Sequence, residues 1–280
     1  MRNLLIVGCG DIGLRAATAL RSRYRLFALS HSPERFDLLR KQGIIPLYGD
    51  LDRAESLSRI SGIAHTVLHL APPQNQGKLD VRTRNLLAAL LKCAIVPHRM
   101  VYISTSGVYG DCGGEYAPET RPVMPETARA MRRLDAERRI RRWGRECGVS
   151  VSILRVPGIY SRERISPSRL MMPVLQQSDD VYTNHIHAED LARIVASAIA
   201  RGLSGRIYNV CDDSAMKMGD YFDLVADGLG LPRPQRMPRM ALKDKLSETM
   251  YSFMSESRRL CNRRMKEELR ISLKYPNVSV

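Results

Sequence analysis

Short apolar runs recur along the first 155 residues, and segments of helical composition separate most of them. The apolar runs predict buried strands at residues 4–7, 25–29, 44–47, 65–70, 100–103 and 149–154. The segments between them predict helices at residues 11–21, 33–41, 54–60, 81–94 and 126–147. Ser32 is placed as N-cap of the second helix, with Pro33 in its first turn. This alternation predicts a parallel sheet with helices on both faces and right-handed crossovers.

The alternation is lost after residue 160. Residues 186–201 predict one strand-like step and a helix, and residues 206–211 predict a further strand. A connector rich in proline and arginine follows at residues 232–238, and the tail from residue 241 has basic, helical composition. The last third of the chain is therefore expected to build something other than a continued sheet.

Composition and charge narrow the class of protein. Hydrophobic residues make up 44% and charged residues 26% of the 280 positions, which excludes a disordered chain, a collagen-like fibre and a coiled coil. No run approaches the roughly 18 apolar residues of a membrane span, and the N-terminal apolar run is too short for a signal peptide. We expect a cytoplasmic protein with no membrane partner. The net charge of +15 favours anionic partners such as nucleotides and phosphorylated substrates.

The cysteines show neither Cys-x-x-Cys pairs nor the Cys/His spacing of a zinc site. They are Cys9, Cys93, Cys112, Cys147, Cys211 and Cys261. We expect reduced thiols, no disulfide framework and no metal.

A glycine-rich loop directly follows the first strand and opens the first helix. Residues 8–13 have the pattern Gly-x-Gly-x-x-Gly, which in this strand–turn–helix context predicts a dinucleotide-binding loop. Gly8 permits the tight turn, Gly10 lets the backbone approach a pyrophosphate, and Gly13 packs the helix on the strand. The helix N-terminus, at Asp11 and Ile12, would hold the phosphates through free N–H groups and its dipole. The alternative is a glycine turn without a ligand.

The end of the second strand bears on which dinucleotide is bound. An acid at this position binds the ribose hydroxyls of NAD, but here the strand ends with Ser30 and no carboxylate occurs before Glu34. Hydroxyl groups with Arg35 nearby suit a 2′-phosphate, which favours NADP and leaves NAD open. The alternative for Ser32 is that it only caps a helix.

Six short motifs, in order along the chain, resemble those of the short-chain dehydrogenase/reductase superfamily. They lie at residues 8–13, 49–51, 69–71, 102–110, 154–160 and 186–192. The resemblance is closest to the extended or atypical branch, which holds NAD(P)-dependent epimerase/dehydratases and nucleoside-diphosphate-sugar epimerase-like proteins. It implies a Rossmann-type doubly wound parallel sheet with a small C-terminal substrate-side subdomain.

The rhythm of the chain and this resemblance together predict two domains. Residues 1–160 would form the NAD(P)-binding Rossmann domain, to which residues 186–210 return. Residues 161–185 and 211–280 would form the smaller substrate-side domain.

The resemblance also implies roles for single residues. Asp50 and Leu51 would lie by the adenine, Leu70, Ala71 and Pro72 would line the nicotinamide side, and Pro157 would pass near the carboxamide. Thr105 matches the catalytic hydroxyl residue that hydrogen-bonds the substrate oxygen, with Ser106 beside it in the same motif. We expect structural roles for His185, His187 and Asp190.

One motif of the family is missing. Its Tyr-x-x-x-Lys precedes an Ala-Glu pair, here Ala136-Glu137, and counting back places Lys at Arg133 and Tyr at Arg129. No other register restores the motif, since neither Tyr nor Lys occurs between Ala117 and Tyr160.

Helical geometry predicts where these arginines point. At about 100° per residue, Arg129 and Arg133 fall on the apolar stripe of the helix and should face the sheet and the cleft. Arg138, Arg142 and Arg145 fall on the opposite, solvated face. A guanidinium on the buried side needs an acceptor, which could be a bound phosphate or carboxylate, a backbone carbonyl, or an acid such as Glu115 or Glu119.

The missing motif leaves the function open. Arginine stays charged and cannot donate the proton, so Tyr109, Tyr116 and Tyr160 are the candidate donors, with packing as the alternative for each. The first hypothesis is an NADP(H)-dependent oxidoreductase or epimerase/dehydratase-like enzyme acting on a small anionic or nucleotide-sugar substrate. The second is a catalytically silent NAD(P)-binding sensor or partner-binding protein.

A third hypothesis is a nucleic-acid binder that uses residues 138–145 and the basic tail. The aromatic content of 6% and the lack of a nucleic-acid motif argue against it. The resemblance also leaves a homodimer open, packed through the helix at residues 126–147.

Overall fold

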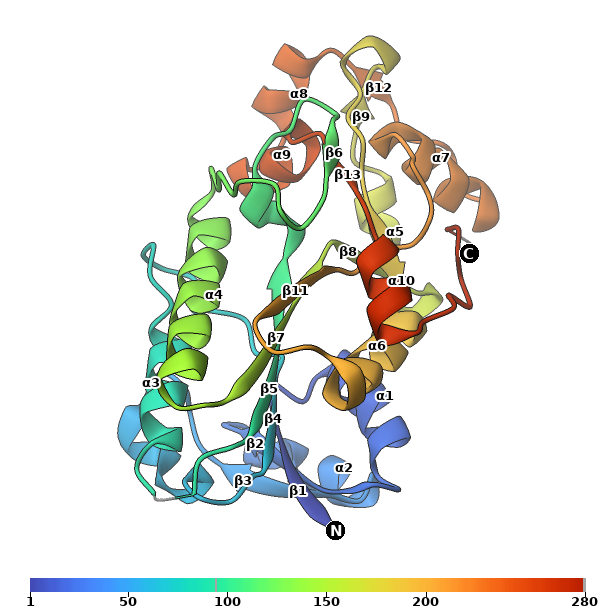
Figure 1. Ribbon diagram of the computed structural model, residues 1–280. Helices are drawn as coiled ribbons and strands as arrows, with labels where there is room; N and C mark the ends of the chain where they lie inside the picture. Colours follow the sequence, from blue (N-terminus) through green and yellow to red (C-terminus); the bar gives the residue numbers. More distant parts are fainter. Residues whose placement is uncertain (94, 279–280) are drawn as a thin grey trace.

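A seven-stranded parallel sheet forms the centre of the computed structural model, which describes residues 1–93 and 95–278 (Figure 1). The strands run in the order β11-β7-β5-β4-β1-β2-β3. They are β1 (Arg2–Val7), β2 (Tyr24–Ser30), β3 (Ile44–Tyr48), β4 (Thr66–His69), β5 (Arg99–Thr105), β7 (Ser150–Val156) and β11 (Arg206–Asn209). The predicted doubly wound α/β fold is therefore confirmed. The strand order reverses between β1 and β4, where such sheets open a crevice at the carboxyl ends of their strands.

Helices cover both faces of the sheet because each strand is apolar on both sides. One face carries α1 (Asp11–Leu20), α2 (Phe36–Lys41), α6 (Ala188–Arg201) and α10 (Arg263–Leu269). The other carries α3 (Val81–Leu90), α4 (Ala128–Glu146) and the 3-10 helix η2 (Ala54–Ile60). Alternate residues of a strand point to opposite faces, so Leu4 and Ile6 join the first apolar layer while Leu5 and Val7 join the second.

Three predicted helices differ from the observed ones. The segment at 33–41 begins as a 3-10 turn, and the side chain of Ser32 makes no capping hydrogen bond. The segment at 54–60 is a 3-10 helix, since the hydroxyl of Ser56 hydrogen-bonds the backbone at Asp50 and Arg53 and competes with α-helical bonding. The helix at 81–94 ends at Leu90, because the chain must turn back to enter β5, and residue 94 lies outside the described residues.

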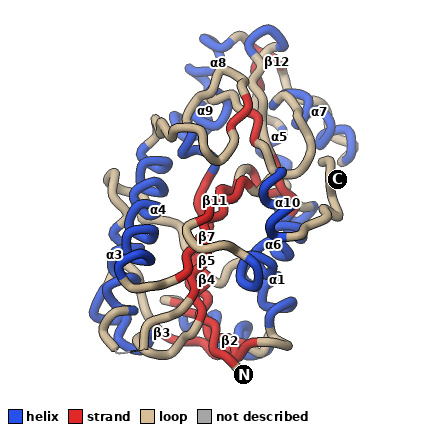
Figure 2. The backbone as a smooth tube through the Cα atoms, in the orientation of Figure 1, coloured by secondary structure: helices blue, strands red, loops and turns tan. Residues whose placement is uncertain are grey.

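A smaller group of elements stands above the carboxyl edge of the sheet (Figure 2). Its helices are α5 (Pro167–Leu170), α7 (Met218–Gly228), α8 (Arg239–Lys245) and α9 (Glu248–Ser255). Its short parallel pairs are β8 (Gly158–Tyr160) with β10 (His185–His187), β9 (Val174–Leu175) with β12 (Arg236–Met237), and β6 (Tyr116–Ala117) with β13 (Arg259–Leu260). An apolar cluster that includes Leu170, Val174, Phe222 and Leu242 joins most of these elements, whereas β6 and β13 contribute to a separate apolar cluster.

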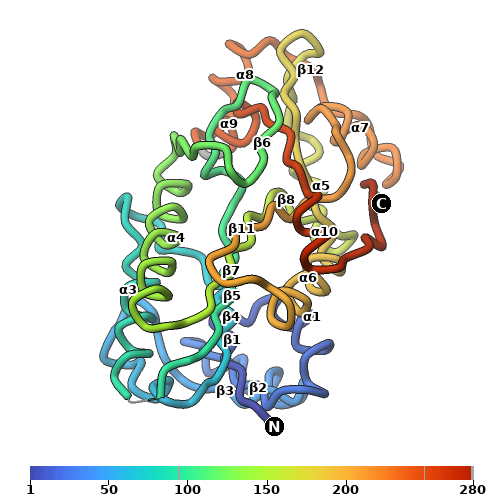
Figure 3. The backbone as a smooth tube through the Cα atoms, in the orientation of Figure 1, coloured from blue at the N-terminus to red at the C-terminus, as the bar shows by residue number. Residues whose placement is uncertain are grey.

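Two details of the C-terminal third correct the sequence-based expectation. The connector at 232–238 contains β12, which gains its strand conformation by pairing with β9. The tail is not helical throughout, because β13 pairs with β6 before the chain returns to the sheet as α10 beside α6 (Figure 3). Within residues 1–93 and 95–278, no helix is both long and apolar enough to cross a membrane.

Candidate active site

The glycine loop packs tightly on one side and is open on the other. Gly8 has a φ of +88°, and a Cβ there would lie 2.5 Å from the backbone nitrogen of Ala71, at the end of β4. A Cβ on Gly10 would meet no protein atom within 4 Å. Gly13 is close-packed, since its Cβ would lie 3.3 Å from the carbonyl oxygen of Gly8. A loop shaped in this way fits a pyrophosphate, because the open backbone at Gly10 faces free N–H groups at the start of α1.

A cavity of about 450 Å³ opens beside this loop, and we call it the glycine-loop cavity. It brings together the predicted contacts Gly8, Gly10, Asp11, Ile12, Gly13, Ser30, Arg35, Asp50, Leu51, Leu70, Ala71 and Pro72. These residues come from the carboxyl ends of β1, β2, β3 and β4, which meet at one edge of the parallel sheet. The sequence motifs thus converge on a single groove.

The end of β2 presents hydroxyl groups and a cation to the glycine-loop cavity. Nη2 of Arg35 donates to the carbonyl oxygen of Cys9 at 2.8 Å, which holds the guanidinium over the glycine loop. The hydroxyl of Ser30 accepts from the backbone nitrogen of Ser32 at 3.2 Å. Burial raises the pKa of the Cys9 thiol to about 11, against the opposing charge of Arg35, so the thiol stays neutral beneath the loop.

A second cavity, of about 350 Å³, lies above the end of β5, and we call it the Thr105 cavity. Thr105, Ser106, Arg129 and Pro157 line it from the sheet side. Residues outside the family motifs line its other walls, among them Arg169, Tyr182, Tyr221, Phe253, Glu256 and Arg258. The two cavities adjoin, since Ile159 and Arg164 line both.

The two arginines that replace the family's Tyr and Lys point into different cavities. Arg133 lines the glycine-loop cavity, where its Nη1 donates to the carbonyl of Ile103 at 2.8 Å and to the hydroxyl of Tyr102 at 3.1 Å. A backbone carbonyl is therefore one of its acceptors. Arg129 lines the Thr105 cavity, with its guanidinium carbon 3.8 Å from the centre of the Phe253 ring. The exposed face of α4 carries Arg138, Arg142 and Arg145, which confirms the faces predicted from helical geometry.

The predicted proton donors are not gathered at Thr105. Tyr109 lines neither cavity, and its buried hydroxyl donates to Asn209 at 2.8 Å. Tyr116 is 59% exposed and stacks on Arg259. Tyr160 does line the Thr105 cavity, but its hydroxyl donates to the carbonyl of Asn277 at 3.1 Å.

Two other tyrosines, Tyr182 and Tyr221, line the Thr105 cavity with hydroxyls that make no hydrogen bond to any residue the structure describes. The ring of Tyr221 stacks at 3.8 Å on His185, which is 5% exposed. Burial lowers the pKa of His185 to about 3, so its ring is neutral at physiological pH. No sequence signal marks Tyr182 or Tyr221, because neither belongs to a motif.

The expected structural role of Asp190 is consistent with its contacts. Its buried carboxylate accepts from the backbone nitrogens of Lys274 and Tyr275, at 3.0 and 2.8 Å, and ties the C-terminal segment to α6. His187 stacks on Tyr275 in the same region.

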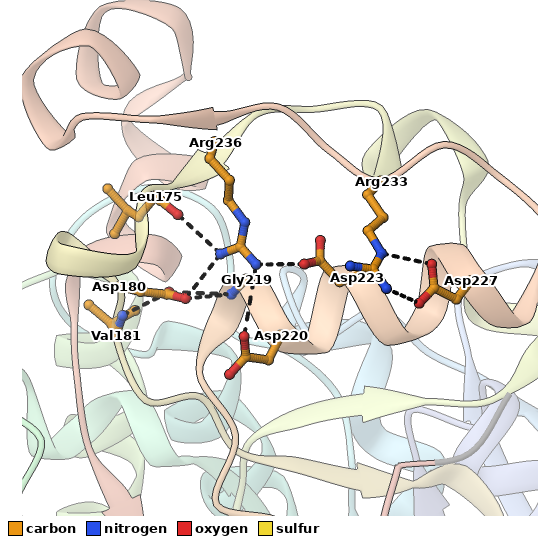
Figure 4. A network of polar contacts seen from close by, with 9 residues as sticks. All are labelled: Leu175, Asp180, Val181, Gly219, Asp220, Asp223, Asp227, Arg233 and Arg236. Atoms are coloured by element: carbon orange, nitrogen blue, oxygen red, sulfur yellow. Dashed lines mark hydrogen bonds and ion pairs between the residues drawn. The ribbon is translucent and has the colours of Figure 1, made fainter.

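A polar network anchors α7, which supplies Tyr221 to the Thr105 cavity (Figure 4). The buried carboxylate of Asp180 accepts from the backbone nitrogen of Gly219 at 3.1 Å, in the first turn of α7. Arg236 bridges Asp180, at 3.2 Å, and Asp223, at 2.7 Å. A Cβ at position 219 would overlap Nη1 of Arg236, so the Arg236 side chain must move before any larger residue fits there.

We expect Gly219→Ala to lower the free energy of unfolding by about 1–3 kcal/mol, since Arg236 must leave a buried carboxylate. Denaturant titration measures the loss. In an Arg236→Ala background the same change should be neutral or stabilising, because alanine is the better helix former. If Gly219→Ala lowers the free energy of unfolding equally in both backgrounds, the overlap with Arg236 is not the cause.

The fold and the glycine loop define a Rossmann-type α/β protein with the phosphate loop of dinucleotide-binding proteins. The model of the NAD dependent epimerase/dehydratase family matches residues 4–211, and the chain belongs to this family. Protein YeeZ of Escherichia coli K12 is 24% identical over 291 residues, which cover 99% of this chain and 97% of YeeZ.

Solved structures show the same fold. A functionally unknown conserved protein from Silicibacter pomeroyi superposes with a TM-score of 0.79 at 28% identity, covering 99% of this chain and 95% of that one. UDP-glucuronic acid 4-epimerase from Bacillus cereus, solved in complex with NAD, superposes with a TM-score of 0.76 at 18% identity, covering 99% and 92%.

Proposed function

We propose that this protein is an NAD(P)-dependent oxidoreductase or epimerase/dehydratase-like enzyme that acts on a small anionic or nucleotide-sugar substrate. The observation that carries the proposal is that the glycine-loop cavity and the Thr105 cavity adjoin at Ile159 and Arg164. A dinucleotide in the first cavity and a substrate in the second would therefore meet. In this proposal residues 1–160 and 186–210 serve the cofactor, and residues 161–185 and 211–280 serve the substrate.

The residues of the glycine-loop cavity suit a nicotinamide dinucleotide. The backbone of Gly10 and the N-terminus of α1 would hold the pyrophosphate, Asp50 and Leu51 the adenine, and Leu70, Ala71 and Pro72 the nicotinamide side. Pro157, which lines the adjoining Thr105 cavity, would approach the carboxamide from there. When bound, the nicotinamide supplies hydride transfer. The NAD complex of the B. cereus epimerase supports this assignment, since the two chains share a fold.

The residues of the Thr105 cavity would bind and orient the substrate. The hydroxyl of Thr105 accepts from the backbone nitrogen of Gly107 at 3.2 Å, which leaves its proton free for a substrate oxygen. Arg129 can stabilise negative charge but cannot donate a proton. A phenol from the far wall, Tyr182 or Tyr221, is therefore a better proton source than Tyr109, whose hydroxyl is engaged outside the cavity.

Titration of the protein with NADPH and NADH, followed by energy transfer from Trp143, tests the proposal first. Binding below about millimolar supports it and justifies a screen of carbonyl substrates. If neither dinucleotide binds, the proposal fails.

The end of β2 favours NADP over NAD. We expect Arg35→Ala to weaken NADPH binding about 10–100-fold, because one charge-assisted hydrogen bond to a 2′-phosphate is lost. NADH binding should change less than about twofold, since it has no such phosphate. Equilibrium titration measures both affinities.

Arg23→Ala is the matched control, since Arg23 is an exposed arginine just before β2 and far from the glycine-loop cavity's lining. It should leave both affinities unchanged. Equal weakening of NADPH and NADH by Arg35→Ala would instead assign Arg35 to holding the loop at Cys9.

A catalytically silent dinucleotide-binding protein is the second candidate. The observation in its favour is that arginine occupies both positions of the Tyr-x-x-x-Lys motif, with Arg133 bound to Ile103 and Tyr102. Turnover of a dinucleotide with any carbonyl substrate would exclude this candidate.

A further inference from the structure

The guanidinium of Arg129 is half-buried and has no hydrogen-bond or ion-pair partner in the described part of the chain. Four arginines line the Thr105 cavity, and two of them are paired: Arg164 with Asp11 at 2.9 Å, and Arg258 with Glu256 at 2.7 Å. The guanidinium groups of Arg129 and Arg169 make no hydrogen bond or ion pair with any residue that the structure describes, and both lie near the Phe253 ring. The cavity thus holds uncommitted positive charge.

The setting of Arg129 calls for an anion. Burial lowers the pKa of Arg129, and the charge of Glu256 offsets this only in part. A guanidinium withdrawn from water costs free energy until acceptors satisfy its donors. Because the Phe253 ring covers one face of the guanidinium at 3.8 Å, the donors in its plane stay open to a ligand. A planar carboxylate matches such a donor pair with two parallel hydrogen bonds.

The position of Arg129 places this anion at the reacting end of the cavity. Arg129 lies one helical turn before Arg133, which is fixed on the carbonyl of Ile103, two residues before Thr105. The start of α4 also abuts the Thr105 turn, since a Cβ on Gly107 would lie 3.7 Å from the Cβ of Ala130. A group held by Arg129 would thus lie near whatever Thr105 contacts.

One wall of the cavity suits an apolar body. Its upper wall is formed by Ile165, Leu170, Met218, Phe222 and Val225. His185 adds a neutral ring, and its buried Nδ1 lacks a hydrogen-bond partner among the described residues. An apolar wall of this kind suits an uncharged part of the ligand, and it leaves His185 available for one polar contact.

We propose that the Thr105 cavity binds a small carboxylic acid with an apolar body, whose carboxylate is held by Arg129 next to the oxygen that Thr105 contacts. This proposal rests on the proposed function in that it names the class of its substrate, an acid functionalised beside the carboxylate. Arg129 stands where the tyrosine of the Tyr-x-x-x-Lys motif would stand. The cavity would therefore hold an anion at the place where a phenol would otherwise donate a proton.

Calorimetric titration of the full chain with 3-phenylpropionate and with its neutral amide tests the proposal. We expect the carboxylate to bind at least about tenfold more tightly than the amide, as one charge-assisted pair implies. Arg129→Met keeps an apolar, unbranched side chain but removes the guanidinium and its charge, so it should abolish that preference and leave the amide unaffected. Arg138→Met, on the exposed face of the same helix, should behave as the parent.

Several results would overturn the proposal. They are equal binding of carboxylate and amide, no detectable binding of the carboxylate, or an unchanged preference in Arg129→Met. Inorganic phosphate that displaces 3-phenylpropionate and binds more tightly would show a phosphate site instead.

The dinucleotide titration separates this proposal from the proposed function. Arg129 does not line the glycine-loop cavity, so Arg129→Met should bind NADPH and NADH as the parent does. If the parent binds neither dinucleotide, the proposed function fails. The carboxylate preference is tested separately, by the titration with 3-phenylpropionate and its amide.

Discussion

Replacing Gly8 with alanine should abolish dinucleotide binding and lower the stability of the fold. The residue holds a φ of +88°, a region that costs an L-residue about 1–2 kcal/mol. The new methyl group would lie 2.5 Å from the backbone nitrogen of Ala71, so the loop and the end of β4 must separate. Separation breaks the hydrogen bond from the Ala71 nitrogen to Val7, which is 2.9 Å long. We expect affinity for both dinucleotides to fall more than about 100-fold, which is about 2.7 kcal/mol.

Gly10→Ala separates the loss of dinucleotide binding from the loss of stability. A Cβ on Gly10 meets no protein atom within 4 Å, so the free energy of unfolding should change by less than about 0.5 kcal/mol. The methyl group would stand where a pyrophosphate approaches, so dinucleotide affinity should still fall at least about tenfold. Denaturant titration and dinucleotide titration of both variants give the comparison. A Gly10→Ala protein with parental affinity would show that the loop is not the dinucleotide site.

The sequence predicts the sheet and the glycine-loop cavity well, for one physical reason. Apolar runs mark buried strands, and the carboxyl ends of parallel strands meet at one edge, so Gly8, Ser30, Asp50 and Leu70 must lie together once the strand order is set. Helix type is less predictable, as η2 shows, because hydroxyl side chains such as Ser56 choose between backbone partners locally.

The Thr105 cavity is only half predictable. The family motif predicts the place of Thr105, and helical geometry predicts that Arg129 faces the cleft. Arg169, Tyr221 and Phe253 come from short helices without motifs, and their approach depends on how the smaller group of elements packs above the sheet. Position in the sequence carries no signal for such contacts, which is why the sequence did not point to Tyr221 as a lining residue of this cavity.

The second large expected effect is a loss of stability on replacing Glu137, the acid of the Ala-Glu pair that follows the missing motif. Glu137 is 2% exposed, and its carboxylate accepts from the hydroxyl of Ser104 at 2.5 Å and from Nη2 of Arg155 at 2.8 Å. These contacts fix α4 to β5 and β7, which positions the Arg129 end of the helix. Burial lowers the pKa of Arg155, but the hydrogen bond and charge of Glu137 outweigh it and raise the pKa overall.

Glu137→Ala should therefore lower the free energy of unfolding by about 3–5 kcal/mol, because it leaves the guanidinium of Arg155 buried and unpaired. Glu146→Ala is the control on the same helix: Glu146 pairs with Arg142 in the open, where the two side chains are 57% and 76% exposed. Glu146→Ala should lower the free energy of unfolding by less than about 0.5 kcal/mol. Denaturant titration of both variants measures the difference, and replacing Glu137 and Arg155 together by methionine should recover part of the loss, since no charge then remains buried. A double variant no more stable than Glu137→Ala would mean that the packing of α4, and not the buried charge, sets the effect.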